Sequence, residues 1–243
     1  MRLIVDIGNS KVKTAIFQEN SCRKTAQWDS LGANKLEQWL EDFPIEAAIY
    51  SDVRGRSQEL TQFLQSRFAA LALTHDTPLP ITLAYRSPET LGKDRIAGAV
   101  GGAALYPDEA VLVIDLGTSI TYDMVEPGGR FVGGQITPGL HMRFKALHTF
   151  TGKLPLVGYE KAVPEIGYNT ATSLQSGVVW GVAHEVNGFI HQYQNTYAGL
   201  KVILTGGDAP VLVSRVKYQI FAVPQLILSG LNKILQYNVE LDK

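Results

Sequence analysis

Residues 2–17 read RLIVDIGNSKVKTAIF and residues 111–125 read VLVIDLGTSITYDMV, so one short pattern occurs twice. Each copy is an apolar run, a tight turn and a second run of β-like composition, which predicts a strand–turn–strand hairpin. Glycine lets such a turn bring backbone N–H groups close to a phosphate, and an aspartate at the strand end can hold a hydrated cation beside it. The matching pairs are Asp6 and Asp115, Gly8 and Gly117, and Ser10 and Ser119.

The repeat predicts a duplicated domain that closes around a nucleotide. We place the first copy in an N-terminal domain, residues 1–109, and the second in a C-terminal domain, residues 110–243. Strand and helix patterns alternate in both halves, which favours an α/β fold. Beyond the hairpins, we expect helices at 33–42, 57–72, 94–105, 138–149, 170–194 and 225–236, strands at 45–51, 81–85 and 201–205, a short strand within 126–134, and a flexible stretch at 151–169.

The composition is that of an ordinary globular protein, with 243 residues, 45% hydrophobic and 19% charged. The net charge of −1 and the scattered basic residues give no reason to expect a nucleic acid or an anionic membrane as a partner. Cys22 is the single cysteine, which excludes an intramolecular disulfide and a zinc site built from cysteines. No apolar run is long enough to span a bilayer, so we expect a cytoplasmic protein.

The first hairpin alone has two interpretations. Asp6 and Asn9 are common in turns that bond only to their own backbone, whereas the second copy favours a phosphate clamp. Neither copy matches a Walker A loop or a GxGxxG fingerprint. Lys11 and Lys13 share a strand face, and one of them would reach a phosphate if the clamp exists, although solvated strand lysines are more common.

The stretch GKDR at 92–95 is the second candidate site. Asp94 at a helix start is either only a cap or a carboxylate kept ionised by the helix dipole and the first N–H groups. In the second case it can accept a proton from a substrate hydroxyl. Arg95 beside it can fork onto a substrate carboxylate.

Two further segments remain open on the residues alone. TGGD at 205–208 is either a turn that ends a strand or backbone that packs near a nucleotide's sugar or base. The helix pattern 170–194 is rich in small and apolar residues, which suits both a buried core helix and an interface between subunits.

Together these motifs resemble the actin, sugar-kinase and Hsp70 (ASKHA) superfamily, and within it the type III pantothenate kinases. The resemblance covers nearly the whole chain in order. It rests on DIGNSKVK (6–13), Tyr85 with GKDR (92–95), DLGTSIT (115–121), GGQITPG (133–139), KLP (153–155) and GYNTATSLQSG (167–177).

The resemblance implies a duplicated actin-like (ribonuclease H-like) fold that phosphorylates pantothenate with ATP and Mg²⁺, the first step of coenzyme A synthesis. It implies that Asp94 is the general base, Asp115 binds a monovalent cation (K⁺ or NH₄⁺) and Asp6 is a Mg²⁺ ligand. It also implies a homodimer in which Thr170 reaches the partner's active site. The implied pantothenate contacts are Tyr85, Gly92, Lys93, Asp94, Arg95 and Thr170, and the implied ATP contacts are Asp6, Ile7, Gly8, Asn9, Ser10, Lys11, Val12, Lys13 and Thr118.

Two rival functions remain. Another ASKHA kinase acting on a sugar or a short acid would lack the pairing of Tyr85 with GKDR. A non-catalytic nucleotide-binding regulator on the same fold would be expected to lack the base, yet Asp94 is present.

Overall fold

The computed structural model describes residues 1–53, 55, 57–160 and 162–241. The chain forms two compact units. The first comprises Met1–Asp108, Pro127–Val132 and Gln225–Lys243, and the second comprises Glu109–Glu126 and Gly133–Pro224. The C-terminal segment therefore belongs to the first unit. The division into domains 1–109 and 110–243 describes the two halves of the sequence repeat and stays a prediction.

The first unit contains a five-stranded sheet in the order β3-β2-β1-β4-β5. The central strand β1 is antiparallel to β2 and parallel to β4. The antiparallel pair is the hairpin predicted from the first copy of the repeat. The strands are β1 (Arg2–Ile7), β2 (Val12–Gln18), β3 (Ser21–Trp28), β4 (Ala47–Asp52) and β5 (Leu71–Ala72).

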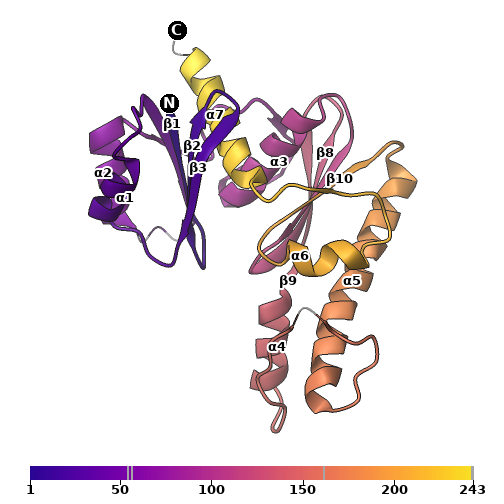
Figure 1. The fold of residues 1–243 in the computed structure, drawn as a ribbon. Coiled ribbons are helices and arrows are strands. Elements are labelled where there is room, and N and C mark those ends of the chain that lie inside the picture. Colours follow the sequence, from indigo (N-terminus) through magenta and orange to yellow (C-terminus); the bar gives the residue numbers. More distant parts are fainter. Residues whose placement is uncertain (54, 56, 161, 242–243) are drawn as a thin grey trace. The chain divides into compact units, whose positions relative to one another are not determined.

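Helices cover both faces of this sheet (Figure 1). On one face, β1 side chains such as Leu3 and Val5 pack in a core cluster with Leu36 and Leu64 of the two helices there. Burial of these apolar side chains is the main source of stability for the layer. The helices on this face are α1 (Ala33–Leu40) and α2 (Gln58–Phe68), and those on the other are α3 (Lys93–Leu105) and α7 (Leu226–Leu241).

Helices α3 and α7 pack with their backbones unusually close together. A Cβ added at Gly230 of α7 would lie 1.8 Å from the carbonyl oxygen of Ala97. A Cβ at Gly101 of α3 would lie 2.8 Å from the carbonyl oxygen of Leu226. These contacts confirm the predicted close packing of the 94–105 helix through small residues.

The second sheet repeats the topology of the first. Its order is β11-β10-β7-β8-β9-β6, with β7 antiparallel to β8 and parallel to β10. Read from β9 to β11, this is the same arrangement as β3 to β5, so the predicted duplication is confirmed. The strands are β6 (Thr82–Leu83), β7 (Val111–Leu116), β8 (Ser119–Glu126), β9 (Arg130–Pro138), β10 (Lys201–Thr205) and β11 (Phe221–Ala222). Strand β6 pairs with Arg130 and Phe131 of β9, and these residues all belong to the first unit.

The long helix α5 (Thr170–Thr196) lies beside α4 (Leu140–Thr149) over its first half. Asn169 caps α5 by accepting a hydrogen bond from the backbone N–H of Thr172, and the Thr172 hydroxyl in turn accepts from the backbone N–H of Asn169. Such a reciprocal cap fixes where the helix begins. The remaining short helices are η1 (Pro88–Thr90), α6 (Ala209–Leu212) and η2 (Val213–Arg215). Within the described residues, we find no helix with the length and hydropathy needed to cross a membrane.

Several predicted boundaries are corrected by the structure. The helix expected over 57–72 ends at Phe68, because Ala69 adopts a left-handed conformation with φ 47° and Leu71–Ala72 forms strand β5. Pro138 does not open the following helix. It ends β9, and Gly139 caps α4 instead.

One strand and one connecting stretch also differ from the sequence interpretation. Strand β3 was not predicted, since its residues alternate between exposed and half-buried without a fully buried position. The stretch 151–169 has no helix or strand in its described residues, but α5 holds it at three backbone carbonyls. The donors are the side chains of Gln175, Ser176 and Trp180, bonded to Gly158, Glu165 and Pro164 at 2.8, 2.6 and 3.1 Å.

The Gly230→Ala variant tests the contact between α3 and α7. The added methyl group has no space against the Ala97 carbonyl, so we expect destabilisation by about 3 kcal/mol, measured as a lower urea midpoint. Gly188→Ala is the control, because Gly188 lies in α5 with no heavy atom within 4 Å of its added Cβ and should gain about 1 kcal/mol. Equal stability of Gly230→Ala and the wild type would contradict the close packing.

Candidate active site

Asp94 lies in the first turn of α3, two residues after the N-cap position. The helix is capped by Gly92, and the Asp94 Oδ1 atom accepts a hydrogen bond from the backbone N–H of Arg95 at 2.9 Å. This N–H therefore orients the Asp94 carboxylate at the start of the helix. The residue itself is only half-buried, so its second oxygen can face a reacting hydroxyl.

Gly92 leaves the space in which the Asp94 carboxylate lies. A Cβ at Gly92 would lie 2.5 Å from Asp94 Oδ1, which is closer than real Cβ atoms approach. The backbone of Gly92 has φ −56°, a value open to any residue. The glycine is therefore required by the position of the carboxylate rather than by the backbone conformation.

Arg95 and Tyr85 meet around a residue that the sequence analysis did not single out. The guanidinium carbon of Arg95 lies 5.8 Å from the ring centroids of both Tyr85 and Phe131, and the two rings are 6.0 Å apart. Arg95 is only 6% exposed, and Phe131 is fully buried. Cation–π contacts of this kind hold the arginine in place and leave a small part of it accessible to a ligand.

Lys93 connects the start of α3 to the central sheet. Its Nζ atom donates to the backbone carbonyl of Asp52, at the end of β4, at 3.0 Å. This contact fixes Lys93 on the sheet side of the GKDR segment. Together these contacts bring Tyr85, Lys93, Asp94 and Arg95 to one end of α3, which is the grouping that the family resemblance implies.

The first candidate phosphate loop, residues 6–13, includes a tight turn between β1 and β2. The Gly8 N–H donates to the Lys11 carbonyl at 3.0 Å, while Asn9 and Ser10 are exposed. Lys11 forms an ion pair with Asp29. Lys13 lies next to Asp6 in the strand register, and its charge acts on that carboxylate.

Asp6 is a buried carboxylate at the end of β1, with 6% of its surface exposed. Burial raises its pKa above the ordinary 3.8, the Ser51 hydrogen bond and Lys13 oppose this shift, and the charge of Asp94 adds to it. Such a group is stabilised by a nearby cation. Among the described residues no group of three or more His, Cys, Asp or Glu could hold a metal ion.

The second phosphate loop is held by the GGQITPG segment. The Gly139 N–H donates to the Thr118 carbonyl at 3.1 Å. A Cβ at Gly139 would lie 2.4 Å from the carbonyl oxygens of both Gly117 and Thr118. Thr118 itself is exposed at the turn, and Asp115 is half-buried at the end of β7.

A carboxylate on α5 fixes the same segment from the other side. Glu185 accepts hydrogen bonds from Tyr122 at 2.9 Å, Thr137 at 2.7 Å and Arg143 at 2.7 Å. Arg143 also donates to the Pro138 carbonyl at 2.8 Å. Burial raises the pKa of Glu185, but these hydrogen bonds outweigh it and hold the pKa below its ordinary value. This network could not be predicted from local sequence patterns, because its members lie on the four elements β8, β9, α4 and α5.

The TGGD segment packs against the end of β7. The Asp208 N–H donates to the Leu116 carbonyl at 3.0 Å, and a Cβ at Gly206 would lie 2.4 Å from Asp115 Oδ1. The hydroxyl of Tyr159 donates to Asp208 at 2.7 Å. This segment is therefore more than a free turn, since its backbone borders the second phosphate loop.

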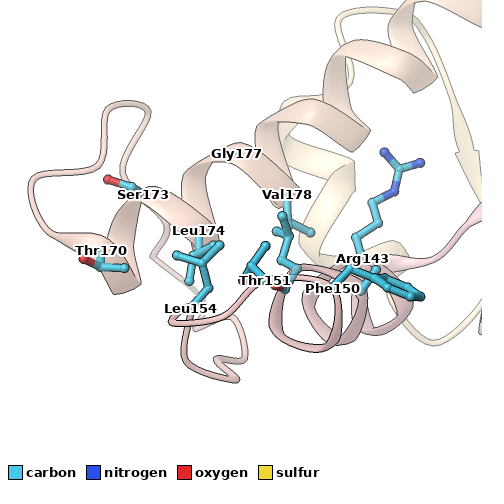
Figure 2. Close-up of a pocket in the computed structure, with 11 residues that line it drawn as sticks. Arg143, Phe150, Thr151, Leu154, Thr170, Ser173, Leu174, Gly177 and Val178 are labelled. Atoms are coloured by element: carbon cyan, nitrogen blue, oxygen red, sulfur yellow. Dashed lines mark hydrogen bonds between the residues drawn. The ribbon is translucent and has the colours of Figure 1, made fainter.

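Thr170 lies at the edge of a groove between α4 and α5, about 910 Å³ in volume. Figure 2 shows Leu174 and Val178 of α5 directed toward Thr151 and Leu154, with the guanidinium of Arg143 turned away. The groove is lined mainly by apolar side chains. It contains neither Asp94 nor either phosphate loop.

The family model for type III pantothenate kinase matches residues 2–192. A type III pantothenate kinase of Phocaeicola vulgatus is 40% identical over 242 residues, covering 99% of this chain and all of the relative. This chain belongs to the type III pantothenate kinase family. The match includes both phosphate hairpins, the GKDR segment and the start of α5.

Solved structures support the fold alone. A Campylobacter jejuni protein named as a Baf family transcriptional activator has a TM-score of 0.63 at 23% identity and covers 98% of this chain and 99% of its own. A ROK family glucokinase from Streptomyces griseus, solved with glucose and AMPPNP, has a TM-score of 0.50 at 12% identity. The match covers 97% of this chain and 98% of the glucokinase chain. The type III pantothenate kinase fold is therefore the actin-like ASKHA fold that the sequence predicted.

The Gly92→Ala variant tests whether the glycine is needed for the carboxylate. The methyl group can be accommodated if Asp94 rotates away, so we expect near wild-type stability but turnover lower by roughly 10²-fold, as for other small misplacements of a reacting group. Kinase assays and urea unfolding measure the two effects.

Gly32→Ala is the matched control, because Gly32 also caps a helix but has nothing within 4 Å of its added Cβ. Its turnover should equal that of the wild type. Undiminished turnover in Gly92→Ala would contradict the role assigned to Gly92.

Proposed function

We propose that this chain transfers the γ-phosphoryl group of ATP to pantothenate, giving 4′-phosphopantothenate, with Asp94 as the general base. The proposal rests on family membership together with one observation, the Asp94 carboxylate held by the Arg95 N–H at the start of α3. A coupled ADP assay with pantothenate and MgATP, with mass analysis of the product, tests the activity directly.

The chemistry asks little of the base. Phosphoryl transfer to an alcohol depends mainly on positioning and charge neutralisation, and in a loose transition state the hydroxyl loses its proton late. A well-placed carboxylate is then a sufficient base. Asp94 accepts this proton through the oxygen that does not bond to Arg95.

ATP is held by both phosphate loops in this proposal. The contacts to ATP are residues 6–13 of the first loop and Thr118 of the second. Asp6 would hold Mg²⁺, which would supply charge neutralisation on the phosphates. Lys13 adds a positive charge near the Asp6 carboxylate.

Pantothenate is held near the start of α3. Tyr85, Gly92, Lys93 and Arg95 form the pocket, with Arg95 fixed by the aromatic rings and Lys93 by the Asp52 carbonyl. Thr170 of the partner subunit completes the pocket in a homodimer.

The homodimer proposal is supported by exposed large apolar side chains between the end of α4 and the start of α5. Phe150, which lines the groove, and Ile166 are each 85% exposed, and Tyr168 is 80% exposed. Exposed large apolar side chains are common at contact surfaces. A second copy of this chain is the proposed occupant, since Thr170 lies at the same edge.

The regulator and the other ASKHA kinases are the rivals. The likeness to the Campylobacter jejuni protein is one of fold and gives no support to a regulatory role here. Nucleotide binding without turnover on any alcohol would favour the regulator, and turnover on a sugar or short acid but not pantothenate would favour another kinase.

Replacing Asp94 by Asn tests the base. We expect the variant to fold and bind nucleotide, shown by unfolding and by thermal stabilisation with ADP, but to lose turnover by roughly 10²–10⁴-fold. Turnover within a few-fold of wild type would remove Asp94 from the mechanism.

Asp115 is the proposed ligand of a monovalent cation. We expect activity in K⁺ or NH₄⁺ buffer that Na⁺ supports poorly, because a carboxylate at this strand end lies where phosphate charge would gather. Asp115→Ala should lose the activation. Equal rates in Na⁺-only and K⁺ buffers would argue against this site.

Mixing two inactive variants tests whether the active site is shared between subunits. Asp94→Asn and Thr170→Trp should each be inactive as homodimers, the second because tryptophan blocks pantothenate. After subunit exchange, one site of each heterodimer has both wild-type residues, so activity should return towards half of wild type per heterodimer. If mass analysis confirms exchange and no activity returns, Thr170 does not act across the dimer.

A further inference from the structure

The end of β4 contacts both candidate motifs of the first unit, although the sequence analysis did not single it out. Ser51 is 1% exposed, and its hydroxyl donates to Asp6 Oδ1 at 2.6 Å. The carbonyl of the next residue, Asp52, accepts from Lys93 at 3.0 Å. The N–H of Val53 donates to the Ile7 carbonyl at 3.1 Å, which continues the pairing into the first phosphate loop.

The position of Ser51 follows from strand register. Strands β1 and β4 are parallel, and Ser51 lies directly beside Asp6. Paired residues of neighbouring strands direct their side chains to the same face of a sheet, so a hydroxyl here can reach the carboxylate. A buried carboxylate without a donor would be strongly destabilising.

The second sheet places a hydroxyl residue at the equivalent position. Thr205 lies beside Asp115 in the parallel pairing of β7 with β10, and it is also 1% exposed. The three residues before it, 202–204, are all apolar and buried. In both halves of the repeat, the parallel neighbour of the central strand therefore ends its apolar run in a hydroxyl residue. That residue lies directly beside the aspartate, Asp6 or Asp115, of the central strand.

We propose that Ser51 is a positioning residue, whose hydroxyl fixes Asp6 Oδ1 so that Oδ2 is presented to the metal–nucleotide complex. The inference rests on the proposed function of Asp6 as the Mg²⁺ ligand. Without the hydroxyl, the carboxylate rotates about its own bond and presents either oxygen. Groups that orient a metal ligand typically change metal affinity or activity by 10–100-fold when removed.

The test measures binding of Mn²⁺ to the enzyme–ATP complex by electron paramagnetic resonance, and the Mg²⁺ dependence of turnover. For Ser51→Ala we expect about tenfold weaker Mn²⁺ binding and a similar rise in the Mg²⁺ concentration for half-maximal rate. KM for pantothenate should not change. Ser51→Thr should recover most of the affinity, because Thr205 occupies the equivalent position of the second sheet.

Thr14→Val is the matched control. Thr14 is fully buried in the same sheet, and its hydroxyl bonds to the Ala26 carbonyl and the Trp28 indole rather than to Asp6. This variant should lose stability but keep wild-type Mn²⁺ affinity. Wild-type Mn²⁺ affinity in Ser51→Ala, or equal weakening in both variants, would overturn the proposal.

The binding arm separates this inference from the proposed function. If the wild type binds Mn²⁺–ATP and Ser51→Ala weakens that binding, the role of Ser51 stands even where pantothenate is not the acceptor. If the wild type does not bind Mn²⁺–ATP, the role of Ser51 is wrong.

Discussion

Each sheet is built on one central strand that has an antiparallel neighbour on one side and a parallel neighbour on the other. In β1 and β7 this arrangement brings a buried strand to its end beside a tight turn, with Asp6 and Asp115 as the last polar residues before the turn. The antiparallel side supplies the turn whose N–H groups can bind phosphate. The parallel side supplies the hydroxyl residue and the backbone that border the aspartate.

The candidate base depends on helix packing rather than on the sheet alone. Helix α3 is held against α7 by contacts that leave no space for a side chain at Gly230. The C-terminal segment thus supports the helix that carries Asp94, although the two are far apart in the chain. At the start of α3, the absence of a side chain at Gly92 and the N–H of Arg95 set the carboxylate. The position of one oxygen atom therefore depends on packing at two glycines.

The sequence predicted the features that arise from local pattern. The two hairpins, the α3 and α5 helices and the grouping of Asp94 with Arg95 follow from apolar runs, turn residues and spacing. Strand β3 was missed because an edge strand with no fully buried position gives a weak alternation signal. Ala69 ended a helix without a glycine or proline to mark the end. Ser51, Phe131 and Glu185 were missed because their importance lies in contacts between segments distant in sequence.

The proposed role of Asp94 as acceptor of the pantothenate hydroxyl proton is best tested by a crystal structure with pantothenate and a non-hydrolysable ATP analogue. We expect the reacting hydroxyl oxygen to lie within hydrogen-bond distance of the Asp94 carboxylate, about 2.6–3.2 Å. A hydroxyl bonded to a different carboxylate, with Asp94 out of reach, would contradict it.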